Sequence, residues 1–228
     1  MKKLAKKYAN ALKEIEKGKL YTVKEASELI KKTSTTKFDS TVEVSFHLNL
    51  DTKQPDQQLR GTLTLPYGNG KTKKVLAITG TKVEEAKAAG ADYAGGVELL
   101  EKIQKENWFD FDVIVATPDM MGQLGRMGRI LGPKGLMPNP KSGTVSPDIA
   151  TAVKEIKNGK LAYRVDKDGN LHLSIARVSF DAEKIAANLQ TVIDTIVRIK
   201  PATVKGAYIT NLVVHTTMGP AIKLAFAN

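Results

Sequence analysis

Val75-Leu76-Ala77-Ile78 and Val113-Ile114-Val115-Ala116 are two continuous apolar runs near the middle of the chain. Runs that are apolar at every position are typical of parallel strands covered by helices on both faces. Helical patterns surround them at residues 82–89, 97–105 and 147–157, with a short strand pattern at 92–94. The sequence therefore predicts a small three-layer α/β unit in the middle of the chain.

The segments on either side follow a different pattern. Apolar and polar residues alternate from Val42 to Leu50, and the alternation returns at Leu171, Leu173 and Ile175. Strands of this kind bury one face and expose the other to water. Amphipathic helices are predicted beside them at 4–15, at 23–30 behind the N-cap candidate Thr22, and at 185–197, with further strands at 61–65 and 207–215.

Because the two ends of the chain share one pattern, we expect them to form one discontinuous α+β domain. It would comprise residues 1–66 and 160–228, interrupted by an inserted α/β domain at residues 67–159. The positive net charge also lies mainly in the discontinuous domain. Residues 1–66 carry 13 basic and 8 acidic groups, residues 160–228 carry 9 and 5, and residues 67–159 carry 13 and 11.

The net charge of +11 indicates a polyanionic partner, either nucleic acid or an acidic membrane. No apolar run approaches the ~20 residues of a membrane-spanning helix. Charges throughout the first 19 residues leave no apolar centre for a signal peptide, so we expect a cytoplasmic protein without a membrane partner. The absence of cysteine excludes disulfides, thiolate nucleophiles and Cys-based zinc sites.

Motifs for catalysis, metals or cofactors are weak, and we predict none of these sites. Gly70-Lys71-Thr72 resembles the end of a phosphate-binding loop, but Leu65 stands where its first glycine belongs. His47, His172 and His215 fall on separate strands, and residues 166–170 favour a hairpin turn over a calcium loop. A nucleotide-dependent α/β enzyme remains the alternative to a binding protein.

The segment from Met120 to Pro147 holds six glycines, four prolines and no acidic residue. Such composition argues against one continuous helix or strand, while its methionines and leucines argue against a solvated linker. Two interpretations remain open: an ordered loop with solvated cations, or a surface that faces an anion. The cations concerned are Arg126, Arg129, Lys134 and Lys141.

Two shorter segments also suit RNA binding. Residues 37–41 combine a cation, an aromatic ring and small polar groups, and residues 216–220 combine hydroxyls, Met218 and Gly219. Hydroxyls can bind the ribose 2′-OH, and a flat or soft apolar side chain can contact a ribose or base. The alternative is that Phe38 and Met218 are core residues at strand ends.

Residues 116–122 (ATPDMMG) and 128–140 (GRILGPKGLMPNP) resemble the hallmark of the bacterial-type L-one family of large-subunit ribosomal proteins. Supporting matches are Lys37-Phe38-Asp39, Arg60-Gly61-Thr62, Gly90-Ala91-Asp92-Tyr93 and Thr217-Met218-Gly219-Pro220. The resemblance covers essentially the whole chain. It implies the same two-domain plan, with both termini in the domain that grips ribosomal RNA and a Rossmann-like inserted domain.

The resemblance also implies a function. A protein of this family is a structural component of the mobile ribosomal stalk, beside the exit site for deacylated tRNA, and not an enzyme. It would also repress its own operon by binding a leader mRNA that mimics the rRNA site. We expect it to be monomeric when free. A free RNA-binding repressor without a ribosomal role is a further alternative.

The family's RNA-binding residues carry over to matching positions of this chain. The implied rRNA and mRNA surface consists of Lys37, Phe38, Thr41, Thr217, Met218 and Gly219, with Arg60, Arg164 and His172 as neighbours. The four cations of residues 120–147 are candidates for a secondary RNA contact, with tRNA or a second rRNA surface. Ser40 departs from the family, which commonly has Glu there, and the change removes a charge near the expected surface.

Overall fold

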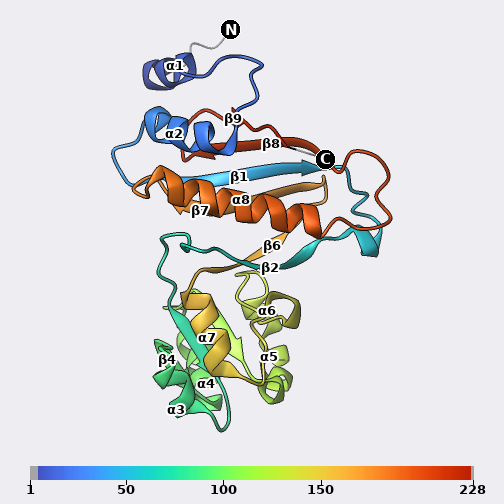
Figure 1. Ribbon diagram of the computed structural model, residues 1–228. Helices are drawn as coiled ribbons and strands as arrows, with labels where there is room; N and C mark the ends of the chain where they lie inside the picture. Colours follow the sequence, from blue (N-terminus) through green and yellow to red (C-terminus); the bar gives the residue numbers. More distant parts are fainter. Residues whose placement is uncertain (1–4, 227–228) are drawn as a thin grey trace. The chain divides into compact units, whose positions relative to one another are not determined.

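The computed structural model describes residues 5–226 and divides into two compact units (Figure 1). The first contains residues 1–70 and 163–228, and the second contains residues 71–162. These boundaries lie a few residues beyond the expected positions 66 and 159. Leu4, the first residue of the helical pattern at 4–15, lies outside the described residues.

The first unit is built on a four-stranded antiparallel sheet of order β7-β1-β8-β9. Helices α2 and α8 contact each other and this sheet, and Figure 1 shows α8 crossing it. The strands are β1 (Thr41–Leu48), β7 (Asn170–Arg177), β8 (Ile209–Thr216) and β9 (Ile222–Lys223). The helices are α1 (Lys6–Lys13), α2 (Val23–Thr33) and α8 (Ala182–Arg198).

Alternation along β1 explains how the sheet packs. Val44 and Phe46 are buried, whereas Ser45 and His47 between them retain exposure. Neighbouring side chains in a strand point to opposite faces, so the apolar face lies in the core and the other face stays wet. The predicted strands with one buried and one solvent-exposed face are therefore confirmed.

The start of α2 also matches its sequence signal. The Thr22 side chain accepts a hydrogen bond from the Glu25 N–H, and the Glu25 carboxylate accepts one from the Thr22 N–H (3.4 and 2.9 Å). This reciprocal pair is a capping box, which satisfies two of the free N–H groups at a helix start.

Strands β2 (Arg60–Thr64) and β6 (Lys160–Arg164) pair with each other in a separate two-stranded sheet. The turn at Asp166–Asn170 is tight, since the Asp166 N–H donates to the Asn170 carbonyl (2.9 Å). It is not a hairpin, however, because β6 pairs with β2 and the next strand, β7, pairs with β1. The alternation of apolar and polar residues predicts which face of a strand is buried, but not which strand pairs with it.

The second unit has three parallel strands in the order β4-β3-β5. Leu76 and Ile114 face one core cluster, and Val75 and Val115 face the other, so helices cover both faces. This confirms the predicted three-layer α/β unit. Its strands are β3 (Val75–Ile78), β4 (Tyr93–Gly95) and β5 (Val113–Ala116). Its helices are α3 (Val83–Ala88), α4 (Val97–Glu106), α5 (Met121–Arg126), α6 (Gly128–Leu131) and α7 (Ile149–Lys157).

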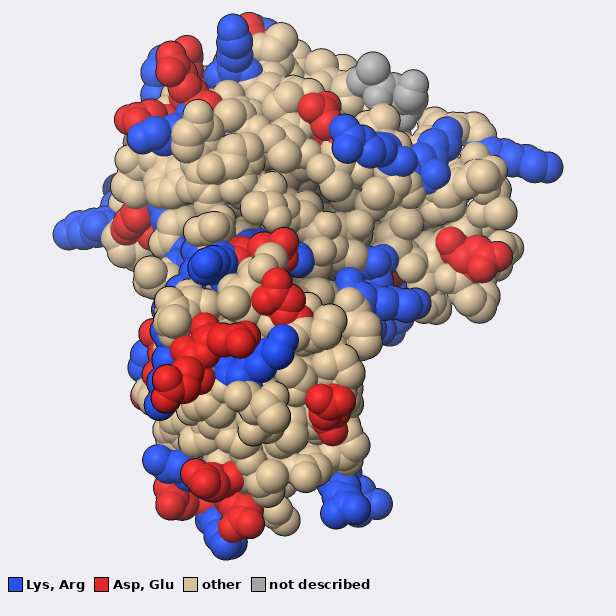
Figure 2. All heavy atoms as spheres, turned by 60° about the horizontal axis from the view of Figure 1, so that its bottom comes forward, with Lys and Arg blue, Asp and Glu red and all other residues tan. Residues whose placement is uncertain are grey.

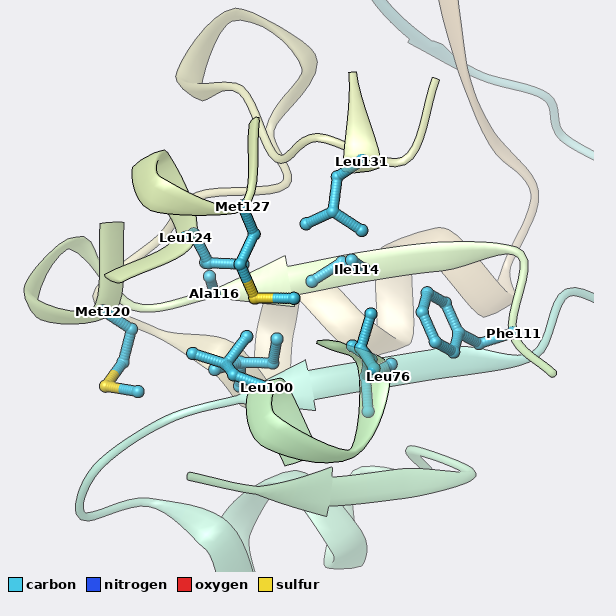
Figure 3. Close-up of a cluster of buried hydrophobic side chains, with 11 residues drawn as sticks. Leu76, Leu100, Phe111, Ile114, Ala116, Met120, Leu124, Met127 and Leu131 are labelled. Carbon is cyan, nitrogen blue, oxygen red and sulfur yellow. The ribbon is translucent and has the colours of Figure 1, made fainter. Parts of the chain in front are cut away.

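The glycine-rich segment of residues 120–147 contributes side chains to one of these two core clusters. Leu124, Met127 and Leu131 are buried beside Leu100 of α4 and Ile114 of β5 (Figure 3). The segment leaves β5 at Ala116 and returns beside it, where Ala116 forms a parallel bridge with Val145. It is thus ordered and is not one continuous helix or strand, as its composition predicted, but it contains the short helices α5 and α6, which the composition did not predict.

Candidate nucleic-acid interface

The two short candidate segments meet at one end of the four-stranded sheet. The Thr41 N–H donates to Thr217 Oγ1 (3.2 Å), and the Thr217 N–H donates to the Thr41 carbonyl (3.0 Å). Thr41 begins β1 and Thr217 follows β8, which pairs with it. Antiparallel pairing therefore brings together two segments that are 176 residues apart in sequence.

A tight turn presents Met218 next to this junction. The Gly219 N–H donates to the Thr216 carbonyl (2.8 Å), which closes a four-residue turn with Met218 as its third residue. Met218 has φ +66° and a side chain that is 75 % exposed. A positive φ at this position normally requires Gly or Asn, so a bulky residue there is strained.

Phe38 gives the same surface a second apolar group. Its side chain is 60 % exposed, and its neighbour Lys37 is exposed as well. The alternative that Phe38 and Met218 are core residues is therefore wrong. Large apolar side chains that are held open to solvent beside cations and hydroxyls are typical of a binding surface.

Gly219 fits closely beneath the turn. A Cβ at this position would collide with Thr216 Oγ1, a buried hydroxyl without a hydrogen-bond partner in the structure. The backbone can come this near to Thr216 only because residue 219 has no side chain. With any larger residue, either the Thr216 side chain would have to rotate or the turn that carries Met218 would have to shift.

Contacts from residues 177–179 hold the other segment. The Asp39 carboxylate accepts hydrogen bonds from the Ser179 N–H and hydroxyl (3.0 and 2.9 Å), and the Ser40 carbonyl accepts one from the Val178 N–H (3.0 Å). Arg177 Nη1 donates to the Asp39 carbonyl (3.0 Å). The sequence indicated none of these contacts, because each joins positions about 140 residues apart.

Ser40 lies on the inner side of this segment. It is fully buried, and its Oγ is 3.2 Å from the Ser34 hydroxyl. Its side chain therefore points into the unit and is not itself part of the exposed surface.

The remaining predicted residues lie apart from this junction. Arg60 begins β2 and Arg164 ends β6, and both are exposed. Their neighbours are hydrogen bonded, since the Val165 N–H donates to the Leu59 carbonyl (3.0 Å), so the two arginines lie near each other in the β2–β6 pair. His172 is exposed on β7, with Nδ1 2.8 Å from Ser45 Oγ. It is five residues from Arg177, the register partner of Thr41, which is about 17 Å along a strand at ~3.4 Å per residue. The sheet thus extends the candidate surface away from the junction.

The other two histidines occupy neighbouring strands. His47 Nδ1 is 2.8 Å from Asn170 Oδ1, and His215 lies across from Glu43 in the β1–β8 register. Within residues 5–226, no group of three or more His, Cys, Asp or Glu side chains could hold a metal ion.

The cations of the glycine-rich segment belong to the second unit. Arg126, Arg129, Lys134 and Lys141 are all exposed. Lys134 Nζ lies 4.2 Å from the centroid of the Phe109 ring, a cation–π contact within the unit. On the face drawn in Figure 2, acidic side chains lie among the basic ones. The buried apolar residues give the segment a structural role, while its cations stay exposed.

Two phenols with perturbed pKa values lie in the first unit, away from the junction. Burial raises the pKa of both Tyr208 and Tyr163. Raised phenol pKa values keep these groups neutral, and the Tyr208 hydroxyl is buried without a hydrogen-bond partner in the structure. Neither residue is poised to act as a base near neutral pH.

Comparison with known families then identifies the chain. The sequence model of the Ribosomal protein L1p/L10e family matches residues 30–220. The chain belongs to this family. Its members are ribosomal proteins, so it is not the nucleotide-dependent enzyme that the Gly70-Lys71-Thr72 loop suggested. That loop also precedes a strand, β3, whereas a phosphate-binding loop precedes a helix.

Three curated relatives match nearly the full chain, and each is named Large ribosomal subunit protein uL1. The proteins of Mycoplasma capricolum subsp. capricolum and Mycoplasma mycoides subsp. mycoides are each 58 % identical over 226 residues, covering 99 % of this chain and 100 % of theirs. The Mesoplasma florum protein is 57 % identical over 224 residues, covering 98 % and 99 %. Among the described residues, no helix has the length and apolar character needed to cross a membrane.

Proposed function

We propose that the protein binds large-subunit ribosomal RNA through the surface formed by residues 37–41 and 217–219. The observation that carries this proposal is Met218, a strained and exposed apolar residue in the turn that hydrogen bonds between Thr217 and Thr41 join to the segment of Phe38 and Lys37. Folding gains nothing from an exposed methionine in a left-handed conformation. Such a conformation persists where the surrounding structure fixes it and a partner uses it.

The chemistry of the surface suits folded RNA. Lys37 supplies a positive charge for phosphates, and Arg60 and Arg164 extend that charge along the β2–β6 pair. Thr217 offers a hydroxyl and Gly219 an accessible backbone for ribose 2′-OH groups. Met218 and Phe38 offer apolar contact to ribose and base, which depends little on salt. The surface is held by internal hydrogen bonds before RNA arrives, so little ordering cost remains for binding.

We also propose a cellular role. As a component of the large subunit, the protein forms the mobile stalk near the tRNA exit site and assists release of deacylated tRNA. It also represses its own operon by binding the mRNA. Support comes from full-length similarity to three proteins named as large-subunit components. Arg126, Arg129, Lys134 and Lys141 are available for a secondary contact with tRNA or rRNA.

Hydroxyl-radical footprinting on large-subunit rRNA tests the proposal. The wild-type protein should protect a compact rRNA site, and Met218→Asp should abolish protection by placing a charge at the apolar contact. Co-sedimentation of the wild-type protein with large subunits separates a ribosomal protein from a free repressor. Protection that survives Met218→Asp unchanged would contradict the proposed surface.

A further inference from the structure

Arg177 joins the segment of residues 37–41 to the rest of the first unit. It is the last residue of β7 and the register partner of Thr41. Its Nη1 donates to two acceptors of that segment, the Asp39 carbonyl (3.0 Å) and the Thr41 hydroxyl oxygen (3.3 Å). The planar guanidinium therefore fixes a backbone group and a side chain at the same time.

The aliphatic stem of Arg177 packs at the point where the chain leaves the unit. Gly70 has φ +71°, and a Cβ there would lie 2.8 Å from Arg177 Cγ and 3.1 Å from a ring carbon of Phe180. Only glycine leaves room for this packing. The stem is thus confined by Gly70 and Phe180, which limits where its guanidinium can reach.

The hydrogen bond to Thr41 also affects the turn that carries Met218. Thr41 O accepts from the Thr217 N–H, and the Thr217 hydroxyl accepts from the Thr41 N–H. A chain of hydrogen bonds therefore runs from Arg177 through Thr41 to Thr217. Thr41 itself is only 8 % exposed, so this chain of hydrogen bonds fixes a nearly buried junction from which the exposed Met218 turn projects.

We propose that Arg177 is a positioning residue for RNA recognition, an inference that rests on the proposed function. It holds the backbone at Asp39 and, through Thr41 and Thr217, the turn that carries Met218 in the geometry that the RNA meets, and its confined stem keeps that geometry in the free protein. This role is distinct from the direct phosphate contact that is proposed for Lys37.

The decisive variant is Arg177→Met, which keeps an unbranched apolar stem and removes the guanidinium. Arg198→Met is the matched control, since Arg198 is an exposed arginine of the same unit at the end of α8. Arg177→Met should weaken affinity for large-subunit rRNA by ~10-fold, whereas Arg198→Met should change it by less than about twofold. Arg177→Lys, which keeps the charge without the planar fork, should restore only part of the loss.

Salt dependence separates positioning from direct contact. Each phosphate neutralised by the protein adds about 0.9 to the slope of log K against log salt concentration. Arg177→Met should leave this slope equal to that of the Arg198→Met control, and in the free protein it should shift the amide NMR signals of Thr41 and Thr217. A slope reduced by about one, with unshifted signals, would show a phosphate contact and overturn the inference.

Gly70→Ala tests the role of the Arg177 stem, and it replaces Arg177→Met as the test if that variant does not fold. As a single substitution, Gly70→Ala should weaken rRNA binding. Added to Arg177→Met it should weaken binding little further, because both substitutions act through the position of the same guanidinium. If Arg177→Met and Arg198→Met bind rRNA equally well while Met218→Asp still weakens binding, the role of Arg177 is rejected and the proposed RNA surface stands. If Met218→Asp also has no effect, the proposed surface itself fails.

Discussion

Replacing Met218 by glycine should separate folding from RNA binding, because the two effects have opposite signs. Met218 is the third residue of a turn and has φ +66°. Glycine is the residue that this position prefers in turns with a positive φ. The substitution therefore relieves the backbone while it removes the exposed side chain.

The expected change in stability follows from two opposing terms. A left-handed conformation costs a non-glycine residue about 1–2 kcal/mol. The extra entropy that glycine loses on folding costs about 0.5–1 kcal/mol. The side chain is 75 % exposed, so its loss removes little packing. Met218→Gly should therefore keep the free energy of unfolding unchanged or raise it by up to about 1.5 kcal/mol.

Met218→Gly should, in contrast, lower the affinity for rRNA. Full burial of a methionine side chain contributes about 1.5–3 kcal/mol. With 75 % of it available for burial against RNA, the loss is about 1–2 kcal/mol, or roughly 5- to 30-fold in Kd.

Urea denaturation and filter binding to large-subunit rRNA at fixed salt measure the two quantities. Val197→Ala is the control, because Val197 is an exposed apolar residue of the same unit on α8. It should leave rRNA affinity unchanged. If Met218→Gly lowers the stability by more than about 1 kcal/mol and keeps full affinity, then Met218 serves the fold and the reasoning is wrong.

Three further predictions concern stability. Leu131→Ala, at a fully buried position of the second unit, should lower the unfolding free energy of that unit by about 2–5 kcal/mol in urea, and a loss below about 1 kcal/mol would contradict the packing of the glycine-rich segment. Thr22→Ala removes the capping box of α2 and should cost about 1 kcal/mol in the same assay, whereas an unchanged midpoint would show that the cap contributes nothing. The Val75 N–H and Lys157 hold the pKa of Asp92 below its ordinary value, so the stabilisation is present above the ordinary Asp pKa and lost as pH falls through the lower folded value. The Tm of wild type should thus fall more steeply than that of Asp92→Asn below about pH 4, and parallel curves would refute this linkage.

Much of the fold was predictable because its signals are local. Alternation at Val44 and Phe46 predicted a half-wet strand, and the continuous run at residues 75–78 predicted a buried parallel one. Strand partners were harder to predict, since alternation shows which face is buried and not which strand lies alongside. The sequence therefore did not predict that β6 pairs with β2 and not with β7, the next strand in the chain.

The candidate site was predictable as a set of residues and less so as a geometry. The resemblance brought together Phe38 and Met218, but the sequence alone left open whether they are core residues. In the sequence Thr217-Met218-Gly219, Gly219 is the obvious residue for a positive φ, yet Met218 adopts it. Arg177 carries no local signal, because its acceptors lie 136 and 138 residues away in sequence.

The central claim is that rRNA affinity resides in the surface around Met218 and not in the cations of the glycine-rich segment. It is tested most directly by comparing two variants in rRNA binding at near-physiological salt. One combines Phe38→Ala with Met218→Asp, and the other replaces four exposed cations by alanine: Arg126, Arg129, Lys134 and Lys141. The first variant should lose at least ~100-fold in affinity and the second less than about fivefold. A loss in the second variant equal to or larger than that in the first would contradict the account.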